Sequence, residues 1–525
     1  MSANPTGDAT TNHNTPSAGV METASKATPA PGPGLDQPVE DAAKTTSSQA
    51  GSSDNAAQSP QDVEKLDAHV PWEEDPANAL NWPTWRKAHL IVMLASYGFV
   101  ASAGTSIISP AQYALIEEFG VSRIRALLPL SLYVFALAFG PVIGGPLSET
   151  LGRLPVYQWT SVLGALFTLG AGFTHNFGAL CFLRFAAGFA WGPALANGSG
   201  SIVETFMPKT RGLMLAIYIL MPFLGPGLAP VLGAFAVSRQ GWRWTQWVLL
   251  FFALFTIIFV ATSRETFPPA IKKRLAKKRG QHVDPAPPLL QRIKVFALIG
   301  LIRPIRMLIT EPLVTLNCLY VSINFGILFS FFAVVPYTFS KVYNFSVEQS
   351  GLVFLAVAVG CFLGLITVFA CDMILYRRQM ANFPPHKVPP EHRLYAAMFT
   401  SVGLPIGLFW YAWTAKESIS WASPVVAIVP FACGNLCIFV CFSQYTADIY
   451  KGSVVASQAS ANSLARYAFA GAFPLFIIQM YEKLGIDWGV SVFAFISVAL
   501  MPIPWTFYKF GPKLRAKSKY DTHQY

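Results

Sequence analysis

The sequence predicts an all-α membrane protein in which twelve transmembrane helices form two six-helix bundles. Of its 525 residues, 53% are hydrophobic and only 12% are charged, whereas soluble proteins average roughly 25% charged residues. A polar segment from Ser263 to Glu311 separates two hydrophobic halves of similar size and holds 11 of the 38 Lys and Arg residues. Two matching halves are typical of secondary transporters, whose substrate site lies between the halves near the middle of the membrane.

The chain divides into five parts by composition. Residues 1–74 are rich in Ser, Thr, Ala, Pro and Gly, so we expect a disordered cytosolic tail that cannot bury a core. No charged segment followed by a short apolar run opens the chain, and we expect no cleavable signal peptide. The first bundle is predicted over 75–262, a basic cytosolic loop over 263–312, the second bundle over 313–509, and a cytosolic tail over 510–525.

Twelve apolar segments are long enough to cross a bilayer, which takes about 20 residues. Many of them contain Gly and Pro, which membrane helices tolerate. The predicted spans are 88–110, 126–148, 155–175, 178–203, 212–236, 244–262, 313–340, 350–371, 394–414, 421–446, 455–480 and 488–508.

The distribution of positive charge predicts the orientation. If the N-terminus is cytosolic, the inward loops and flanks carry 26 Lys and Arg residues and the outward loops carry 7. Positive charge concentrates on the cytosolic side of membrane proteins, so we expect both termini in the cytosol. The net charge of +11 therefore reflects membrane topology and contact with the lipid bilayer, and we expect no nucleic-acid partner.

Motifs of enzymes and of ATP-driven pumps are missing. The sequence contains no GxxxxGK[ST], HExxH or GxSxG pattern, and its eight histidines are scattered, so we expect no enzyme, no cofactor and no metal. Cys433, Cys437 and Cys441 recur at a spacing of four. We interpret this row as small packing residues, with a metal site as the alternative.

Several stretches, over roughly residues 75–515, resemble the major facilitator superfamily and, within it, the fungal drug:proton antiporters with twelve spans. The resemblance implies the major facilitator fold and transport by alternating access. The stretches are GGPLSETLGR (144–153), LCFLRFAAG (180–188), LGPGLAPVLG (224–233), WRW (242–244), RETFPP (264–269), PEHRLYAAMFTSVGLPIGLFWYAWT (390–414) and RYAFAGAFPLFIIQMYEKLG (466–485).

GGPLSETLGR resembles the superfamily's signature between spans two and three, with Glu149 in place of the usual aspartate. The resemblance implies a gate on the cytosolic side built from Gly145, Glu149, Gly152 and Arg153. Glu149 and Arg153 can pair across the loop, and a carboxylate there can face the N-terminal end of span eleven, near residues 452–455. The simpler interpretation is a topology determinant with a surface ion pair.

The second half carries charges at corresponding places. Asp372 and Arg377 lie in the loop between spans eight and nine, and the fourth and tenth spans end at Glu204 and Asp448. This correspondence is a sign of an internal repeat. We therefore predict that these four residues take part in gating as well.

Arg184 lies inside span four, where a charge is costly, so it should face the interior of the bundle. In the family that this chain resembles, the corresponding arginine is associated with proton coupling. The alternative is a structural arginine that bonds to backbone carbonyls.

LGPGLAPVLG resembles the antiporter signature of the same family through Gly225, Pro226, Pro230 and Gly233. Ala229 stands in place of one expected glycine, and Ala234 in place of another. In the family this signature accompanies export by antiport. The alternative is a generic helix bent by its prolines.

Arg466 is the second charge inside a span, and it either bonds to carbonyls or meets an anionic substrate. No Asp or Glu lies near the middle of any span, which disfavours organic cations such as polyamines and favours neutral amphipathic or anionic cargo. Other substrate-binding candidates are polar or aromatic residues of the spans that line the cavity in this fold: Trp191, Asn197, Tyr320, Asn324, Asn435, Gln444 and Tyr445.

Asn344 begins an Asn-Phe-Ser glycosylation triplet in an outward loop. The triplet lies close to the predicted end of span seven. Glycosylation of Asn344 is the modification that the sequence predicts.

Together these observations predict a functional monomer that exports a small amphipathic compound, such as a secondary metabolite, toxin or drug, in exchange for protons. We expect it in the fungal plasma membrane, with the vacuolar membrane as the alternative. A second hypothesis is the export of an organic acid such as a dicarboxylate, with Arg466 or Arg184 as counter-charge. A receptor built on the same fold is disfavoured because the tails offer no signalling domain.

Overall fold

The computed structural model describes residues 71–280, 296–384, 388–451, 453–520 and 522, and within them it contains helices and no β-strand. The predicted tail up to residue 70 and the middle of the predicted basic loop, 281–295, lie outside the described residues. The all-helical fold class predicted from the sequence is confirmed.

The helices of the first half follow the predicted spans. Span four is made of two helices, α7 and α8, which meet at Gly192 and Pro193. In chain order the elements are η2 (Ala79–Asn81), α2 (Thr84–Ser106), η3 (Ser109–Ala111), α3 (Gln112–Phe119), α4 (Arg123–Ala126), α5 (Leu128–Leu151), α6 (Arg153–Phe173), α7 (Phe177–Trp191), α8 (Pro193–Thr205), α9 (Pro208–Gln240) and α10 (Trp244–Thr262).

Among the described residues between the halves, the helices are α11 (Pro268–Lys278), the π-helix η4 (Phe296–Ile302) and α13 (Arg303–Thr310). The elements of the second half are α14 (Pro312–Tyr343), α15 (Val347–Leu352), α16 (Leu355–Cys371), the π-helix η5 (Asp372–Tyr376), α17 (Arg377–Met380), η6 (Pro390–Leu394), α18 (Tyr395–Thr400), α19 (Gly403–Thr414), α20 (Ala422–Ile449), α21 (Ser453–Leu500) and α22 (Ile503–Ala516).

Ten continuous helical stretches among the described residues are long and apolar enough to cross a membrane. One of them, Val454–Ala516, covers two predicted spans. It is broken at Gly485, whose φ of +81° is a backbone conformation that glycine adopts readily and other residues avoid. The 21-residue α6, which lies outside these ten stretches, packs against α7 and α10. Each of the twelve predicted spans thus falls mainly on helical residues, with some spans built from more than one helix and with α21 reaching from span eleven into span twelve.

Some helices extend several residues past the predicted span ends, as α9 and α14 show, whereas α10 matches its span and α6 ends before its span does. A helix keeps its backbone groups hydrogen-bonded, and this need does not end where the apolar residues end. Span limits read from hydropathy therefore mark the apolar part of each helix.

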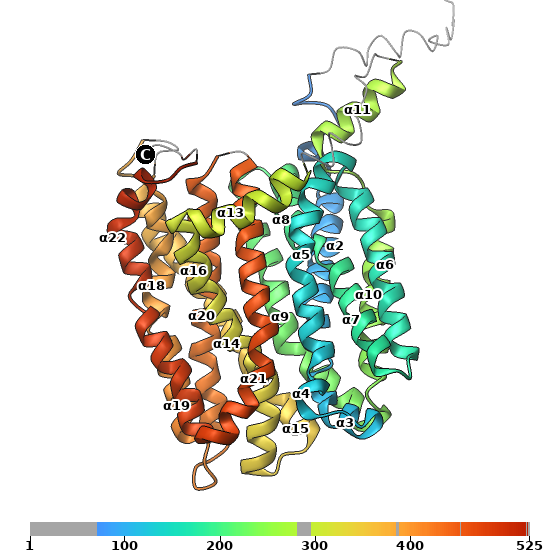
Figure 1. Cartoon of the computed structure of the whole chain (residues 1–525). Helices are drawn as coiled ribbons and strands as arrows, with labels where there is room; N and C mark the ends of the chain where they lie inside the picture. The colour runs from blue at the N-terminus through green and yellow to red at the C-terminus, as the bar shows by residue number, and fades with distance from the viewer. Residues whose placement is uncertain (1–70, 281–295, 385–387, 452, 521, 523–525) are drawn as a thin grey trace, which may run out of the picture. The chain divides into compact units, whose positions relative to one another are not determined.

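The two halves meet along a few helices, and Figure 1 shows the first half (blue to green) beside the second (yellow to red). Within the halves, α2 packs along α9, and α14 packs along α21. Between the halves, α5 packs against α21, and α9 packs against α15 and α16. A site between the halves therefore has α5, α9, α14 and α21 close to it.

Candidate functional site

Arg153 is the centre of a polar cluster at the predicted cytosolic end of the first half. Its guanidinium lies 3.1 Å from Glu204, donates to the Ser148 hydroxyl at 2.5 Å and reaches the Asn197 side-chain oxygen at 3.4 Å. Gly152, with a φ of +99°, lets the chain turn from α5 into α6 so that Arg153 can begin the next helix. The cluster joins α5, α6 and α8.

Glu149 takes no part in this cluster, so the expected pair between Glu149 and Arg153 is not formed. Its side chain is exposed and makes no ion pair among the described residues. Successive residues of a helix point about 100° apart, and on α5 it is Ser148 that faces Arg153. Gly145 likewise faces open space, since a Cβ atom added there would have no neighbour within 4 Å, whereas Gly144 packs closely against Pro193.

Glu265 is a member of the same cluster that the motifs did not single out. Its carboxylate accepts hydrogen bonds from the backbone N–H groups of Arg153 at 2.8 Å and Leu154 at 3.2 Å, and it is 6% exposed. A carboxylate at the N-terminus of α6 meets unpaired N–H groups and the positive end of the helix dipole. In the sequence, the RETFPP stretch at 264–269 contains Glu265 and could have indicated that this residue belongs to the site.

Arg393 organises the corresponding cluster in the second half. It lies 3.2 Å from Asp372 and 3.0 Å from Asp448, and its guanidinium carbon lies 3.9 Å from the centre of the Tyr376 ring. The two acids were predicted, but the arginine was expected at Arg377. Arg377 is exposed on α17 and makes no ion pair among the described residues. Arg393 reaches both acids because η6 lies beside α20 and η5.

Arg184 is fully buried and surrounded by acceptors. Its guanidinium donates to the backbone oxygens of Gly104 and Pro129 and lies 3.5 Å from the Gln246 side-chain oxygen. The guanidinium carbon also lies 4.5 Å from the centre of the Tyr133 ring. Arg184 therefore joins α7 to α2, α5 and α10.

The four residues of the antiporter signature lie in α9, and the two glycines among them face α2. A Cβ atom at Gly225 would lie 2.7 Å from the Ser102 hydroxyl, and one at Gly233 would lie 2.1 Å from the Ile107 backbone oxygen. Pro226 and Pro230 lie between these glycines inside the same helix. The glycines allow α2 and α9 to approach more closely than any side chain would permit.

A cavity lies between the halves. Arg466 is the one charged residue among the residues that line it, and the other polar groups are the hydroxyls of Ser102, Thr105, Tyr218 and Tyr467. The remaining lining residues are apolar: Leu137, Leu195, Ile219, Pro222, Phe223, Phe325, Phe329 and Phe439. Both halves contribute to the walls.

Among the predicted substrate-binding residues, Arg466 alone lines this cavity. Most of the others are buried in contacts between neighbouring helices. Asn197 belongs to the Arg153 cluster, where it also donates to the Gly144 backbone oxygen. Trp191 is fully buried, with its ring 4.9 Å from that of Tyr97.

In the second half, Asn435 donates to the Asn324 backbone oxygen at 2.7 Å, and Asn324 donates to the Tyr320 backbone oxygen. Tyr445 is buried with its ring 5.8 Å from that of Phe507, and Gln444 is half-buried on α20. Position along a span thus did not predict which side of each helix meets the cavity.

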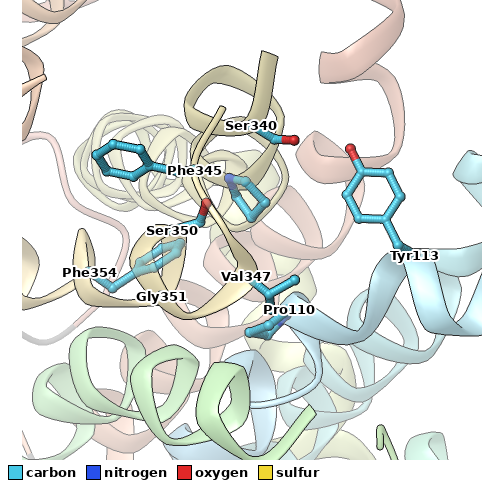
Figure 2. A pocket seen from close by; sticks show the side chains of 9 residues that line it. Pro110, Tyr113, Ser340, Phe345, Val347, Ser350, Gly351 and Phe354 are labelled. Carbon is cyan, nitrogen blue, oxygen red and sulfur yellow. The ribbon is translucent and has the colours of Figure 1, made fainter. Parts of the chain in front are cut away.

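A second pocket lies between the halves at the predicted outer end (Figure 2). Pro110 and Tyr113 come from the first half, and Figure 2 shows the Ser340 and Tyr113 side chains on facing sides of it. Its other lining residues belong to α14, α15 and the residues next to them: Pro336, Phe345, Val347, Ser350, Gly351 and Phe354.

Two ion pairs connect the halves at the same end. Arg123 lies 3.2 Å from Glu482, and Arg239 lies 3.5 Å from Glu348. Ser238 also donates to Glu348 at 2.6 Å. These contacts hold the two halves together at the predicted outer end.

Asn344 is exposed directly after α14. Its φ of +53° places it in the left-handed region, which asparagine tolerates better than most residues. The side chain therefore stands at a helix end within reach of solvent.

A family model described as Major Facilitator Superfamily matches residues 94–474. Relatives among known proteins cover most of the chain. It is 36% identical over 490 residues to "Polyamine transporter 4" of Saccharomyces cerevisiae, covering 88% of this chain and 74% of that protein. It is 36% identical over 474 residues to "Ascochitine biosynthesis cluster MFS transporter" of Didymella fabae, covering 87% and 90%.

A third relative, "Efflux pump FUBT" of Fusarium oxysporum, is 33% identical over 462 residues and covers 85% of this chain and 76% of its own length. Among solved structures, the peptide transporter POT in complex with sulfate matches with a TM-score of 0.62. That match covers 85% of this chain and 99% of the other at 13% identity, so it concerns the fold alone.

Proposed function

This chain belongs to the major facilitator superfamily, and we propose that it is a proton-coupled exporter of a small amphipathic organic compound, such as a secondary metabolite, toxin or drug. The observation that carries this proposal is the cavity between the halves, whose walls are apolar with a few hydroxyls and one arginine. Sites for drug-sized molecules have this character. The relatives named as an efflux pump and as a biosynthesis-cluster transporter support the same function.

Alternating access supplies the mechanism. We propose that the halves 75–262 and 313–509 rock about the cavity. The ion pairs of Arg123 and Arg239 would hold the outer end closed while cargo enters from the cytosol. The Arg153 and Arg393 clusters keep the inner helix ends of each half together, so that each half moves as one body. Glu204, Asp372 and Asp448 are thereby assigned an indirect part in gating, since their arginine contacts keep each half rigid while it rocks.

Proton coupling is assigned to Arg184. Its hydrogen bonds connect α7 to three neighbouring helices, so a shift of α7 in the membrane must break or exchange them. Water that reaches Arg184 during the transition would compete for the same acceptors. The resemblance of the α9 residues to the antiporter signature supports exchange with protons, and the glycines of this signature hold α9 in close contact with α2.

An organic acid is a second candidate cargo. The specific observation in its favour is Arg466, a cation that lines the cavity. The polyamine transporter among the relatives points to cationic cargo for that protein, whereas the described lining of this cavity includes no carboxylate.

The chain is a multi-pass membrane protein. We place it in the plasma membrane as a functional monomer, with the vacuolar membrane as the alternative. The tails 1–74 and 510–525 and the loop 263–312 are assigned to the cytosol, on the charge distribution of the sequence.

The test is export from fungal cells that lack or overexpress the protein, with the medium profiled by untargeted mass spectrometry at two external pH values. We expect amphipathic compounds to accumulate outside only when the protein is present, more at the lower external pH, and to stop accumulating when a protonophore is added. If these compounds continue to accumulate outside after the protonophore is added, proton coupling is contradicted.

Arg184→Ala tests the coupling residue. We expect the variant to reach the membrane in normal amount and to lose export that depends on the proton gradient. Arg184→Lys keeps the charge but loses the forked geometry, and we expect partial export. Full gradient-driven export by Arg184→Ala would remove Arg184 from the mechanism.

A further inference from the structure

The two arginines inside the membrane have opposite surroundings. Arg184 is bound by two backbone oxygens and by the Gln246 side chain. Arg466 makes no hydrogen bond and no ion pair with any residue that the structure describes, and its buried Nε atom has no acceptor there. A guanidinium carries five N–H donors and stays charged in proteins, so Arg466 lacks the acceptors that Arg184 already has.

Three aromatic rings surround the Arg466 guanidinium in place of acceptors. Its central carbon lies 4.7 Å from the ring centre of Phe325, 4.5 Å from that of Phe439 and 4.5 Å from that of Tyr467. Rings stabilise a cation through their faces, but they accept hydrogen bonds only weakly. The three rings therefore stabilise the positive charge of Arg466 in part, and they leave its N–H groups free to donate hydrogen bonds to a ligand.

The rings also form one wall that crosses the boundary between the halves. Phe223 on α9 lies 5.1 Å from Phe439 on α20 and 6.1 Å from Phe325 on α14, measured between ring centres. All three line the cavity together with Arg466. A flat conjugated molecule fits such a wall because aromatic groups stack or meet edge to face at these distances.

We propose that the cargo is a flat, conjugated, largely apolar molecule with a single acidic group, a carboxylate or an ionised phenol or enol, that accepts hydrogen bonds from Arg466. This inference rests on the proposed function and narrows its substrate class. The cavity has one cation for one negative charge. A dicarboxylate brings a second charge without a partner, and a polyamine brings positive charge toward an arginine with no carboxylate in the described lining.

The test is equilibrium binding to the purified full-length chain without a proton gradient, using probes that share one ring system. The probes are 1-naphthoate, 1-naphthamide, 1-naphthylmethylamine and naphthalene-1,4-dicarboxylate, with spermidine as a competitor. We expect 1-naphthoate to bind about tenfold or more tightly than the other naphthalene probes, since a charge-assisted hydrogen bond contributes that much. Spermidine should not displace it.

Arg466→Gln should bind 1-naphthoate and 1-naphthamide within about twofold of each other, because the charge that distinguishes them is gone. Arg466→Lys should keep the preference for the anion. Arg125→Gln is the matched control, since Arg125 is exposed and outside the cavity lining, and it should bind every probe as the unchanged chain does. Binding of 1-naphthamide by Arg466→Gln shows that this variant is folded.

The proposal is overturned if the unchanged chain binds the amide, the amine or the dicarboxylate as tightly as 1-naphthoate. It is also overturned if spermidine displaces 1-naphthoate, if millimolar 1-naphthoate does not bind, or if Arg466→Gln keeps the preference. If Arg466→Gln does not fold, the probe series on the unchanged chain and on Arg466→Lys still decides. Export is measured separately, so gradient-driven export of neutral compounds without anion preference would refute this inference and leave the proposed function intact.

Discussion

The guanidinium of Arg153 lies 3.1 Å from the carboxylate of Glu204, and the two side chains are only 12% and 13% exposed. Arg153 begins α6 and Glu204 stands in the last turn of α8. The pair therefore connects two helix ends that are 51 residues apart in sequence, and it does so beside the backbone contacts of Glu265.

Replacing Arg153 with Ala should destabilise the protein by about 2 kcal/mol or more, because Glu204 would stay largely buried without its cation. The measurement is reversible unfolding or the melting temperature of the purified protein in detergent. Glu149→Gln is the matched control from the same turn, and because Glu149 is exposed its effect should stay within about 0.5 kcal/mol. Equal losses in the two variants would contradict the assignment.

In the second half, Arg393→Gln should lower stability and transport, whereas Arg377→Gln should leave both nearly unchanged. Arg393 contacts Asp372 and Asp448, but Arg377 is exposed without an ion pair among the described residues. Both acids are more than a third exposed, so we expect a loss of about 1 kcal/mol. A larger loss of stability and transport from Arg377→Gln than from Arg393→Gln would mean that the positive charge of the loop itself, and not the ion pairs of Arg393, is what matters.

Gly233→Ala should disturb the contact between α2 and α9, because its Cβ would lie 2.1 Å from the Ile107 backbone oxygen. Overpacking of this kind costs about 1–3 kcal/mol, and we expect slower transport with it. Gly212→Ala on the same helix has no atom within 4 Å of the added carbon, and should be neutral or stabilising by up to about 1 kcal/mol. Melting temperatures and transport rates of the two variants check the prediction.

Glu482→Lys should loosen the predicted outer end, since it replaces the attraction to Arg123 with repulsion. Exposed pairs contribute at most about 1 kcal/mol, so stability should hardly change. The readout is maleimide labelling of Ser340→Cys in the outer pocket, which should become faster. Glu417→Lys, an exposed change without an ion pair among the described residues, is the control, and equal acceleration by both would refute the gating role of the Arg123 pair.

Part of the candidate site could be predicted from the sequence. Burial of Arg184 and Arg466 follows from their apolar surroundings, and the signature on α9 contains the glycines that contact α2. Glu265 is part of the RETFPP stretch. Its role as the acceptor for the first N–H groups of α6 depends on α10 ending beside the turn between α5 and α6. Arg393 was missed because proximity in sequence favoured Arg377.

The order of residues along the chain was enough to establish an all-helical protein with twelve membrane-length segments in two halves, and its resemblance to a transporter superfamily. The segments follow from counting apolar residues, because the free energy of moving a segment from water into lipid is nearly a sum over its own residues. Three-dimensional packing was needed to show that Arg153 pairs with Glu204, and that Arg466 lines the cavity while Asn435 bonds another helix. Those outcomes depend on how each helix is rotated about its axis, where one residue changes the direction of a side chain by about 100°, and on contacts with helices far away in sequence.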